Sequence, residues 1–303
     1  MSMPISAVTP ERVLQRLDWQ VIRRLDGLLQ GDYRSLFYGF GVDFADLREY
    51  QAEDDIRYID WNVTARMDTP YVRQYTEDRE VSAWFLLDMS PSVDFGTVQT
   101  VEGKRAVLID FVTVLARLLT RHGNRVGAMM FGNGIQHTVP ARGGRTQVLR
   151  LINDMLKQPR LSHVPFTDLK LLLKGALNSI KRRSLIFIVS DFISAPGWEA
   201  PLSLLNQRHE VVAVRLWDQA EVDLPDVGVM VMEDAETGEQ LYVDTHDKKF
   251  RNRFNASMHQ RESELKQSFK RAGVDILSLS TEADMVRTLV RFAEQRKQLR
   301  RMR

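Results

Sequence analysis

Short apolar segments alternate with amphipathic helical segments over most of this 303-residue chain, and this alternation constrains the fold more than any other feature. Six segments are rich in β-branched and aromatic residues and are expected to be strands: 81–87, 125–131, 135–139, 184–189, 211–216 and 274–279. Strands that alternate with helices form parallel βαβ units. The runs SAWFLL and LIFIV are almost continuously apolar, as strands covered on both faces are. The sequence therefore predicts an α/β fold, with a doubly wound, mainly parallel six-stranded sheet and helices on both faces.

Three further elements are expected around that sheet. Residues 9–29 carry apolar side chains at helical spacing, with Thr9 placed to cap a helix and Pro10 in its first turn. A charged, aromatic-rich stretch follows, so we expect residues 1–80 to form an N-terminal helix and arm that pack on a main domain over 81–303. The segment EDAETGEQLYVD predicts a β-hairpin inserted near 227–244, and TEAD at 281–284 predicts a capping box for the last helix.

Composition limits the chemistry open to the chain. It has no cysteine, which excludes disulfides, a thiolate zinc site and a cysteine nucleophile. The formal charge of +2 does not by itself indicate a nucleic-acid partner, and the basic C-terminal segment is interpreted as a solvated helix face, with an anionic partner as the alternative. No apolar run approaches the roughly 18 residues of a membrane span. We therefore expect a cytoplasmic protein without direct membrane insertion.

The segment FLLDMSPSVDFG, at 85–96, delivers a carboxylate and two hydroxyls from the end of a predicted strand. Side chains alternate along extended backbone, so Asp88, Ser90 and Ser92 are expected on one side of it. Pro91 favours an extended conformation at Ser90. These hard oxygen ligands suit Mg²⁺ or Mn²⁺. Alone, the same pattern more often marks a helix cap or a loop whose polar groups are satisfied.

Two further residues favour the metal site over that simpler interpretation. Asp191 closes the strand segment FIVSD, and the carboxyl ends of parallel strands share one edge of a sheet. Thr167 opens the helical segment TDLKLLL, although a threonine there also serves as an ordinary N-cap. Together the five residues predict an oxygen shell for Mg²⁺ or Mn²⁺ drawn from three loops.

This set resembles the metal-ion-dependent adhesion site of von Willebrand factor A domains, and 81–303 resembles that fold. The resemblance implies a metal held by five residues, with direct bonds from the hydroxyls and bonds through water from the aspartates. Those residues are Asp88, Ser90, Ser92, Thr167 and Asp191. We further expect the loops at 94–100 and 143–145 to flank the metal edge.

The stretch before the sheet resembles a narrower family, catalogued as domain of unknown function fifty-eight. The positions that match its motifs are Phe44, Arg48, Tyr50, Asp54, Asp55, Arg57, Ile59, Asp60, Trp61, Ala65 and Arg66. The segment QAEDD departs from the proline and glycine common there, which affects only the local turn. Genes of this family typically accompany MoxR-type AAA+ ATPases. The resemblance therefore implies an adaptor or chaperone-like role beside such an ATPase.

The acids and arginines of 54–66 have two interpretations. They can form a salt-bridged clasp that holds the arm to the main domain, with Trp61 as its anchor, or a second functional surface.

Three classes of function follow from these observations. The first is a non-enzymatic module that binds an acidic residue of a MoxR-type ATPase, or of its client, through the metal. The second is a metal-dependent, phosphatase-like hydrolase that uses Asp88, but the second aspartate of that chemistry is replaced by Ser90. The third, a nucleic-acid binder, lacks the expected interleaving of aromatic and basic residues. No phosphate-binding loop is present, since the nearest match, from Gly96 to Lys104, has the wrong spacing.

Overall fold

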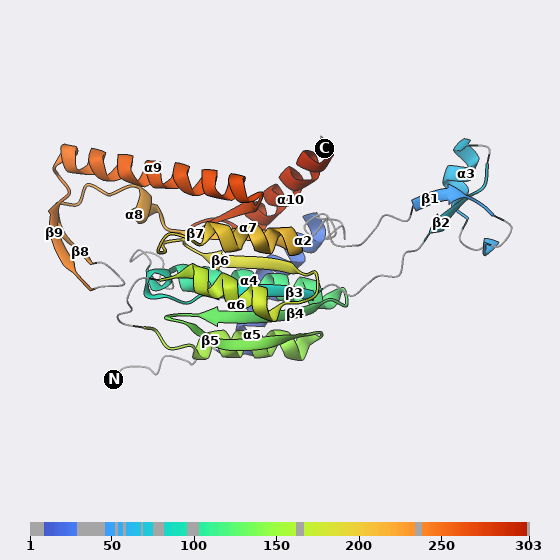
Figure 1. The fold of residues 1–303 in the computed structure, drawn as a ribbon, viewed down its shortest axis with the longest axis horizontal. Helices are drawn as coiled ribbons and strands as arrows, with labels where there is room; N and C mark the ends of the chain where they lie inside the picture. The colour runs from blue at the N-terminus through green and yellow to red at the C-terminus, as the bar shows by residue number, and fades with distance from the viewer. Residues whose placement is uncertain are drawn as a thin grey trace.

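The computed structural model describes residues 9–28, 46–51, 54–56, 59–67, 69–74, 82–95, 103–161, 167–233 and 238–301. Its main body is a sheet between two layers of helices (Figure 1). The strands of the sheet are β3 (Ser82–Asp88), β4 (Arg125–Phe131), β5 (Ile135–Arg142), β6 (Leu185–Ser190), β7 (Glu210–Trp217) and β10 (Asp275–Ser280). The helices around it are α1 (Pro10–Leu17), α2 (Arg23–Leu28), α4 (Gly103–Arg121), α5 (Arg145–Lys157), α6 (Leu169–Ser179), α7 (Glu199–Arg208), α8 (Gln219–Val222), α9 (Lys248–Ala272) and α10 (Met285–Arg301).

The six-stranded sheet has the strand order β10-β7-β6-β3-β4-β5. All neighbouring pairs are parallel except β4 and β5, which are antiparallel. The predicted α/β class and mainly parallel sheet are therefore confirmed. Five of the strands lie within a residue or so of their predicted bounds, whereas β5 continues three residues beyond its predicted end, to Arg142.

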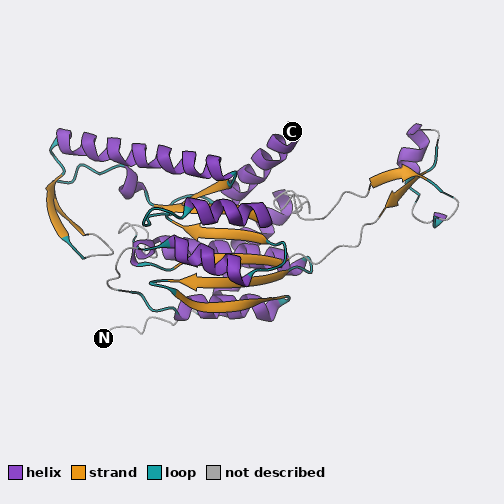
Figure 2. Cartoon of the chain, viewed as in Figure 1, coloured by secondary structure: helices purple, strands orange, loops and turns teal. Residues whose placement is uncertain are grey.

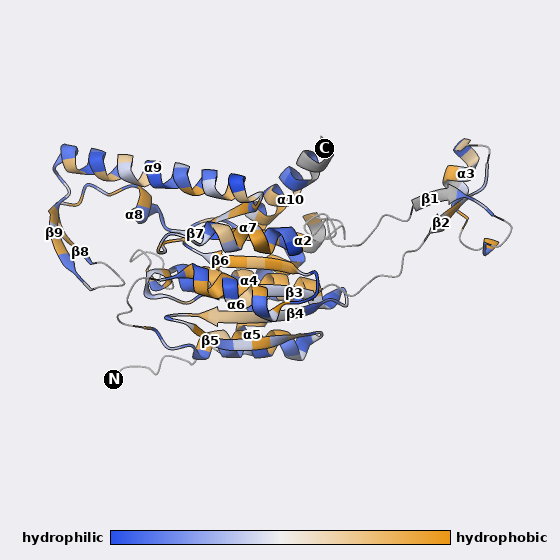
Figure 3. Ribbon diagram, in the orientation of Figure 1, coloured by the Kyte–Doolittle hydropathy of each residue, from blue (hydrophilic) through white to orange (hydrophobic). Residues whose placement is uncertain are grey.

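Two apolar layers hold the sheet between its helices. On one face, Phe85, Phe187 and Val212 pack with α1, α2, α4, α5 and α10. On the other, Leu86, Ile188 and Ala213 pack with α6, α7 and α9. Successive strand residues thus contribute to opposite faces, which explains the continuous apolar runs. Figure 2 shows the helices lying along the sheet, and Figure 3 shows its strands as predominantly hydrophobic against a mostly hydrophilic α9.

The N-terminal helix forms as the sequence predicts, with one irregularity. Thr9 accepts a hydrogen bond from the Arg12 backbone N–H at 3.4 Å, and Pro10 follows it in the first turn. A π-helical turn (Asp18–Ile22) separates α1 from α2. The buried residues Leu14, Leu17 and Leu25 join the core beside α4 and α5.

The arm contains a helix, α3 (Trp61–Met67), and two antiparallel strands, β1 (Asp46–Glu49) and β2 (Tyr71–Gln74). Asp60 begins the helix, since its carboxylate accepts from the Val63 N–H at 3.3 Å. Trp61, the expected anchor, is 66% exposed, so it is not buried as the clasp requires. Phe44 and Arg57 lie outside the described residues. Packing of the arm on the main domain stays a prediction.

The inserted hairpin consists of β8 (Val229–Glu233) and β9 (Gln240–Asp244), which pair in antiparallel register. Residues 234–237 of the segment EDAETGEQLYVD lie outside the described residues. The Thr245 hydroxyl closes its base by donating to the Gly228 carbonyl at 2.7 Å. Among the helices that the structure describes, none is long and apolar enough to cross a membrane.

The predicted capping box of the last helix is wrong in its assignment. Asp284 caps α10, because its Oδ1 accepts from the N–H groups of Val286 and Arg287 at 2.9 and 3.3 Å. The Thr281 hydroxyl instead donates to Asp218 Oδ2 at 2.8 Å, between β10 and the end of β7. The threonine therefore joins two loops, and the helix begins three residues later than a cap at Thr281 requires.

Candidate functional site

The candidate site lies at the carboxyl ends of β3 and β6. These strands are parallel neighbours, and Leu87 pairs with Val189 near their ends. Asp88 ends β3 and Asp191 follows β6, so the two aspartates lie at one edge of the sheet. The topology thus places both carboxylates where ligands bind in open α/β sheets.

Asp88 is buried and held at both oxygens. Its Oδ1 accepts from the Ser90 N–H at 3.0 Å, and its Oδ2 accepts from the Ser190 hydroxyl at 2.6 Å. Burial, with the nearby charge of Asp191, raises the pKa of Asp88 to about 6, against the hydrogen bonds from the two serines. The raised pKa indicates negative charge that this site does not fully compensate.

The two predicted serines come together beside Asp88. Ser90 has extended backbone, as Pro91 favours, but Ser92 lies in a short 3₁₀ turn (Pro91–Asp94) and not in extended chain. Their hydroxyl oxygens are nevertheless 3.1 Å apart. The Ser92 side chain also hydrogen-bonds Asp191. The structure therefore connects four of the five predicted residues through hydrogen bonds.

Thr167 is buried in the neighbouring loop. Its carbonyl accepts from the Ala195 N–H at 2.9 Å and from the Ser194 hydroxyl at 3.0 Å. These bonds join its loop to the one that follows Asp191. The N-cap of α6 is Asp168, whose side chain accepts from the Lys170 N–H, so capping does not explain Thr167.

A lysine that the sequence analysis did not select completes the cluster. Lys104, in the first turn of α4, has a side chain with 0% exposure. Its Nζ donates to Asp191 Oδ2 at 2.8 Å and to Glu221 Oε1 at 2.5 Å. The available signal was its place at the start of GKRAVLIDFVTVL, a helix apolar on more than one side, where a lysine has few routes to solvent.

The lysine and its two carboxylates stabilise one another's charges. Burial alone would lower the pKa of Lys104, but the charges of Asp191 and Glu221 raise it. Burial would likewise raise the pKa of Asp191, but Lys104 holds it below its ordinary value. For Glu221, burial outweighs Lys104, and its pKa is raised. One buried ammonium is therefore shared between two carboxylates, Asp191 and Glu221.

The donor set fits a hard divalent cation. Two carboxylates and three hydroxyl-bearing side chains are oxygen donors of the kind that Mg²⁺ and Mn²⁺ prefer. Asp88, Asp191 and Glu221 contribute three buried or partly buried carboxylates against the single ammonium of Lys104. A divalent cation would offset the remaining negative charge. Within the described residues, no group of three or more His, Asp or Glu side chains is arranged to hold a metal, so such a site depends on the hydroxyls.

Comparison with known proteins identifies the family. The model of the family "Protein of unknown function DUF58" matches residues 46–264. The chain belongs to the DUF58 family. Uncharacterized proteins of Mycobacterium bovis and Mycobacterium tuberculosis are each 34% identical to it over 284 residues, which cover 94% of this chain and 89% of theirs.

Solved structures are more distant. An aerotolerance-related membrane protein from Bacteroides fragilis has a TM-score of 0.45 at 14% identity, and BatB, a conserved hypothetical protein from Bacteroides thetaiotaomicron, has 0.45 at 13%. Each match covers 72% of this DUF58 chain and 99% of the other.

One of the two loops expected beside the site lies elsewhere in this DUF58 member. Because β5 is antiparallel to β4, its last residue Arg142 pairs with Val126 near the start of β4. The loop at 143–145 therefore lies at the opposite edge of the sheet, and its predicted place is wrong. The loop at 132–134 takes that position, since it follows Phe131, whose carbonyl accepts from the Met89 N–H at 2.7 Å. Residues 96–100 of the other loop lie outside the described residues.

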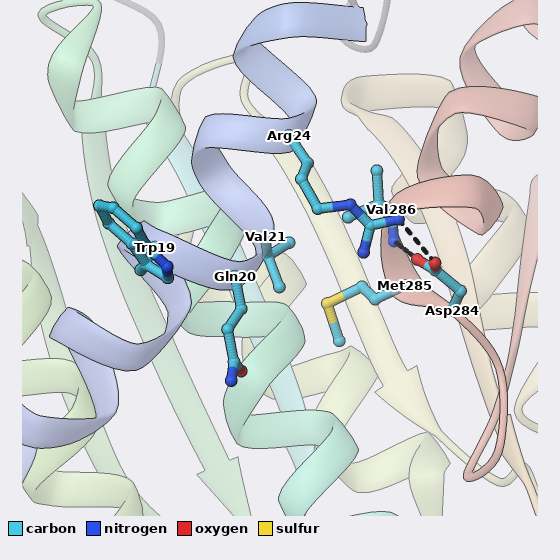
Figure 4. A pocket seen from close by; sticks show the side chains of 7 residues that line it. All are labelled: Trp19, Gln20, Val21, Arg24, Asp284, Met285 and Val286. Carbon is cyan, nitrogen blue, oxygen red and sulfur yellow. Dashed lines mark hydrogen bonds and ion pairs between the residues drawn. The ribbon is translucent and has the colours of Figure 1, made fainter.

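A separate pocket of about 650 Å³ lies between the N-terminal helix and the start of α10. Figure 4 shows Arg24 reaching across it to Asp284, an ion pair of 2.9 Å. The remaining lining residues are Trp19, Gln20, Val21, Met285 and Val286. None of the five predicted site residues lines this pocket, so it is distinct from the candidate site.

Proposed function

We propose that this chain is a non-enzymatic protein-interaction module with a von Willebrand factor A-like main domain. Asp88, Ser90, Ser92, Thr167 and Asp191 would hold Mg²⁺ or Mn²⁺ at its carboxyl edge. When bound, the metal would offer a coordination position to a carboxylate of a partner protein. The observation that carries this proposal is the meeting of buried hydroxyls and carboxylates, with uncompensated negative charge, at that edge.

The partner that we propose is a MoxR-type AAA+ ATPase or its client, engaged by the chain as an adaptor or chaperone-like factor. The support is the family membership together with the resemblance described above. We propose the cytoplasm as the compartment, because an AAA+ ATPase acts where ATP is supplied. One metal–carboxylate bond does not sustain a complex, so the surrounding edge must contribute to an interface of about 1,200 Å² or more.

The hydrolase alternative has weaker support from the geometry. Asp88 is fully buried, and both of its oxygens accept hydrogen bonds, so direct attack of this carboxylate on a phosphate is disfavoured, whereas contact with a metal through water is not. Of the histidines that the structure describes, His137 contacts Asp154 at 3.1 Å and His122 contacts the Leu118 carbonyl, so neither is held as a base for the serine hydroxyls. His163 lies outside the described residues. Both observations favour binding over catalysis.

The test is the metal dependence of partner binding. We would immobilise the purified chain and measure binding of the MoxR-type ATPase from the same cell, in Mg²⁺ and in EDTA. Binding should weaken about tenfold or more in EDTA, and the double variant Ser90→Ala/Ser92→Ala should show the same loss in Mg²⁺. The circular dichroism of the variant should match that of the wild type. Equal affinity in EDTA and Mg²⁺ would place the interface away from the metal edge.

A further inference from the structure

We propose that Lys104 is a tethered cation that competes with the divalent metal for Asp191, with Glu221 as the second position of its ammonium group. This inference rests on the proposed metal site. It adds that Lys104 sets the affinity of that site for the divalent metal. The carrying observation is geometric: a fully buried ammonium lies 2.8 Å from a carboxylate oxygen of the expected ligand set.

The position of Lys104 is fixed by its surroundings. Gly103 precedes it with a φ of 58°, in the left-handed region, and a Cβ there would meet the Phe95 carbonyl oxygen at 2.9 Å. The Lys104 N–H donates to that same carbonyl at 3.0 Å, and its Nζ lies 5.7 Å from the centre of the Phe95 ring. The start of α4 is therefore held so that the lysine side chain enters the cluster.

The ammonium and a divalent cation oppose each other at Asp191. Two like charges a few ångströms apart repel strongly where water is excluded. Asp191 Oδ1 already accepts from the Ile193 N–H at 3.0 Å, and Oδ2 holds the ammonium. A metal at Asp191 therefore gains most of its binding energy only if Nζ moves away from Oδ2. The wild-type site should bind metal more weakly than its oxygen donors alone would.

Glu221 supplies the place to which Nζ can withdraw. Its Oε1 already accepts from Lys104, and its Oε2 accepts from the Asp218 N–H at 3.1 Å within a capping box that begins α8. This carboxylate is thus fixed in place independently of Lys104. The lysine can release Asp191 while keeping an ion pair with Glu221. Glu221 is accordingly a positioning residue that acts on the metal site through Lys104.

The test is Mn²⁺ binding by the full chain, measured by calorimetry and by the electron paramagnetic resonance signal of free Mn²⁺. Lys104→Met should bind Mn²⁺ about tenfold more tightly than the wild type, because the competing charge is gone. Glu221→Gln should bind several-fold more weakly, because the ammonium keeps only Asp191 as a charged partner. Lys157→Met removes the same charge from the exposed end of α5 and should leave the affinity unchanged.

Thermal unfolding provides a second measurement. Lys104→Met leaves Asp191 without its cation, so the melting temperature of the variant in EDTA should be lower than that of the wild type. Addition of Mg²⁺ should raise the melting temperature of the variant by more than it raises that of the wild type. If Lys104→Met does not fold, Glu221→Gln alone decides, since it keeps the lysine in place. An affinity in Glu221→Gln equal to or above that of the wild type overturns the inference.

The outcomes separate this inference from the proposed function. Equal Mn²⁺ binding by the wild type and Lys104→Met overturns the competition and leaves the metal site standing. No binding by the wild type with tight binding by Lys104→Met supports the competition in its strongest form. No Mn²⁺ binding by the wild type or any variant overturns both, because the lysine is then the permanent cation of the cluster.

Discussion

Charge is the property that distinguishes the site at the scale of single residues. Asp88 accepts from the Ser90 N–H and the Ser190 hydroxyl, whereas Asp191 accepts from the ammonium of Lys104. Two aspartates at one sheet edge therefore differ in charge compensation: the pKa of Asp88 is raised to about 6 and that of Asp191 is lowered. The uncompensated aspartate is the one that a metal would stabilise most.

Asp88→Asn should separate metal binding from folding. The amide keeps one acceptor oxygen and so loses one of the two hydrogen bonds that Asp88 accepts, but it also removes a buried charge. The gap in stability between variant and wild type in EDTA should therefore shift in favour of the variant by up to about 3 kcal/mol between pH 4 and pH 8. A folded-state pKa raised from 3.8 to about 6 lowers wild-type stability as pH rises through that window, so the gap should open there. Urea unfolding in EDTA at pH 4, 6 and 8 would measure it. A gap of constant size across these values would contradict the charge argument.

At the scale of elements, the local apolar pattern of the sequence predicted the positions of the strands but not the contacts between segments distant in sequence. The apolar runs identified β3, β4, β6 and β7, since these strands bury both faces, and alternating apolar residues identified the edge strand β10. The same logic brought Asp88 and Asp191 to one edge. It could not find Lys104, because burial of a lysine depends on Glu221, which lies 117 residues away. The loop at 143–145 was misplaced because strand direction is not encoded in apolar pattern.

Substitutions at the start of α10 test whether Asp284, and not Thr281, caps this helix. Asp284→Ala removes two backbone hydrogen bonds and the ion pair with Arg24, so it should cost about 1–2 kcal/mol in the free energy of unfolding. Asp284→Asn keeps a capping oxygen and should lose less than half as much. Glu282→Ala, at an exposed position beside it, serves as the control. Chemical denaturation would show whether the ranking holds; a loss in Asp284→Asn as large as that in Asp284→Ala would contradict capping by the Asp284 side-chain oxygen.

At the scale of the whole molecule, the two parts of the N-terminal segment have different roles. The helix before the arm adds Leu14, Leu17, Ile22 and Leu25 to the core beside α4 and α5. The arm forms its own contacts between β1 and β2, and Asp60 connects α3 to β2 because its N–H donates to the Tyr71 carbonyl at 2.8 Å. Stability of the main body is therefore expected to depend on the helix.

Two substitutions in this segment should have opposite outcomes. Leu17 is 2% exposed, so Leu17→Ala should lower the free energy of unfolding by about 2–5 kcal/mol through lost burial and a residual cavity. Trp61 is exposed, so Trp61→Ala should change it by about 0.5 kcal/mol or less, with Mn²⁺ binding unchanged in both folded variants. Urea unfolding followed by far-ultraviolet circular dichroism would measure both, since it does not depend on tryptophan fluorescence. A loss of about 2 kcal/mol or more in Trp61→Ala would mean that the ring is buried in solution, which is the clasp that the acids and arginines of 54–66 first indicated. A small loss leaves an exposed aromatic ring on the arm, the property expected of the second functional surface.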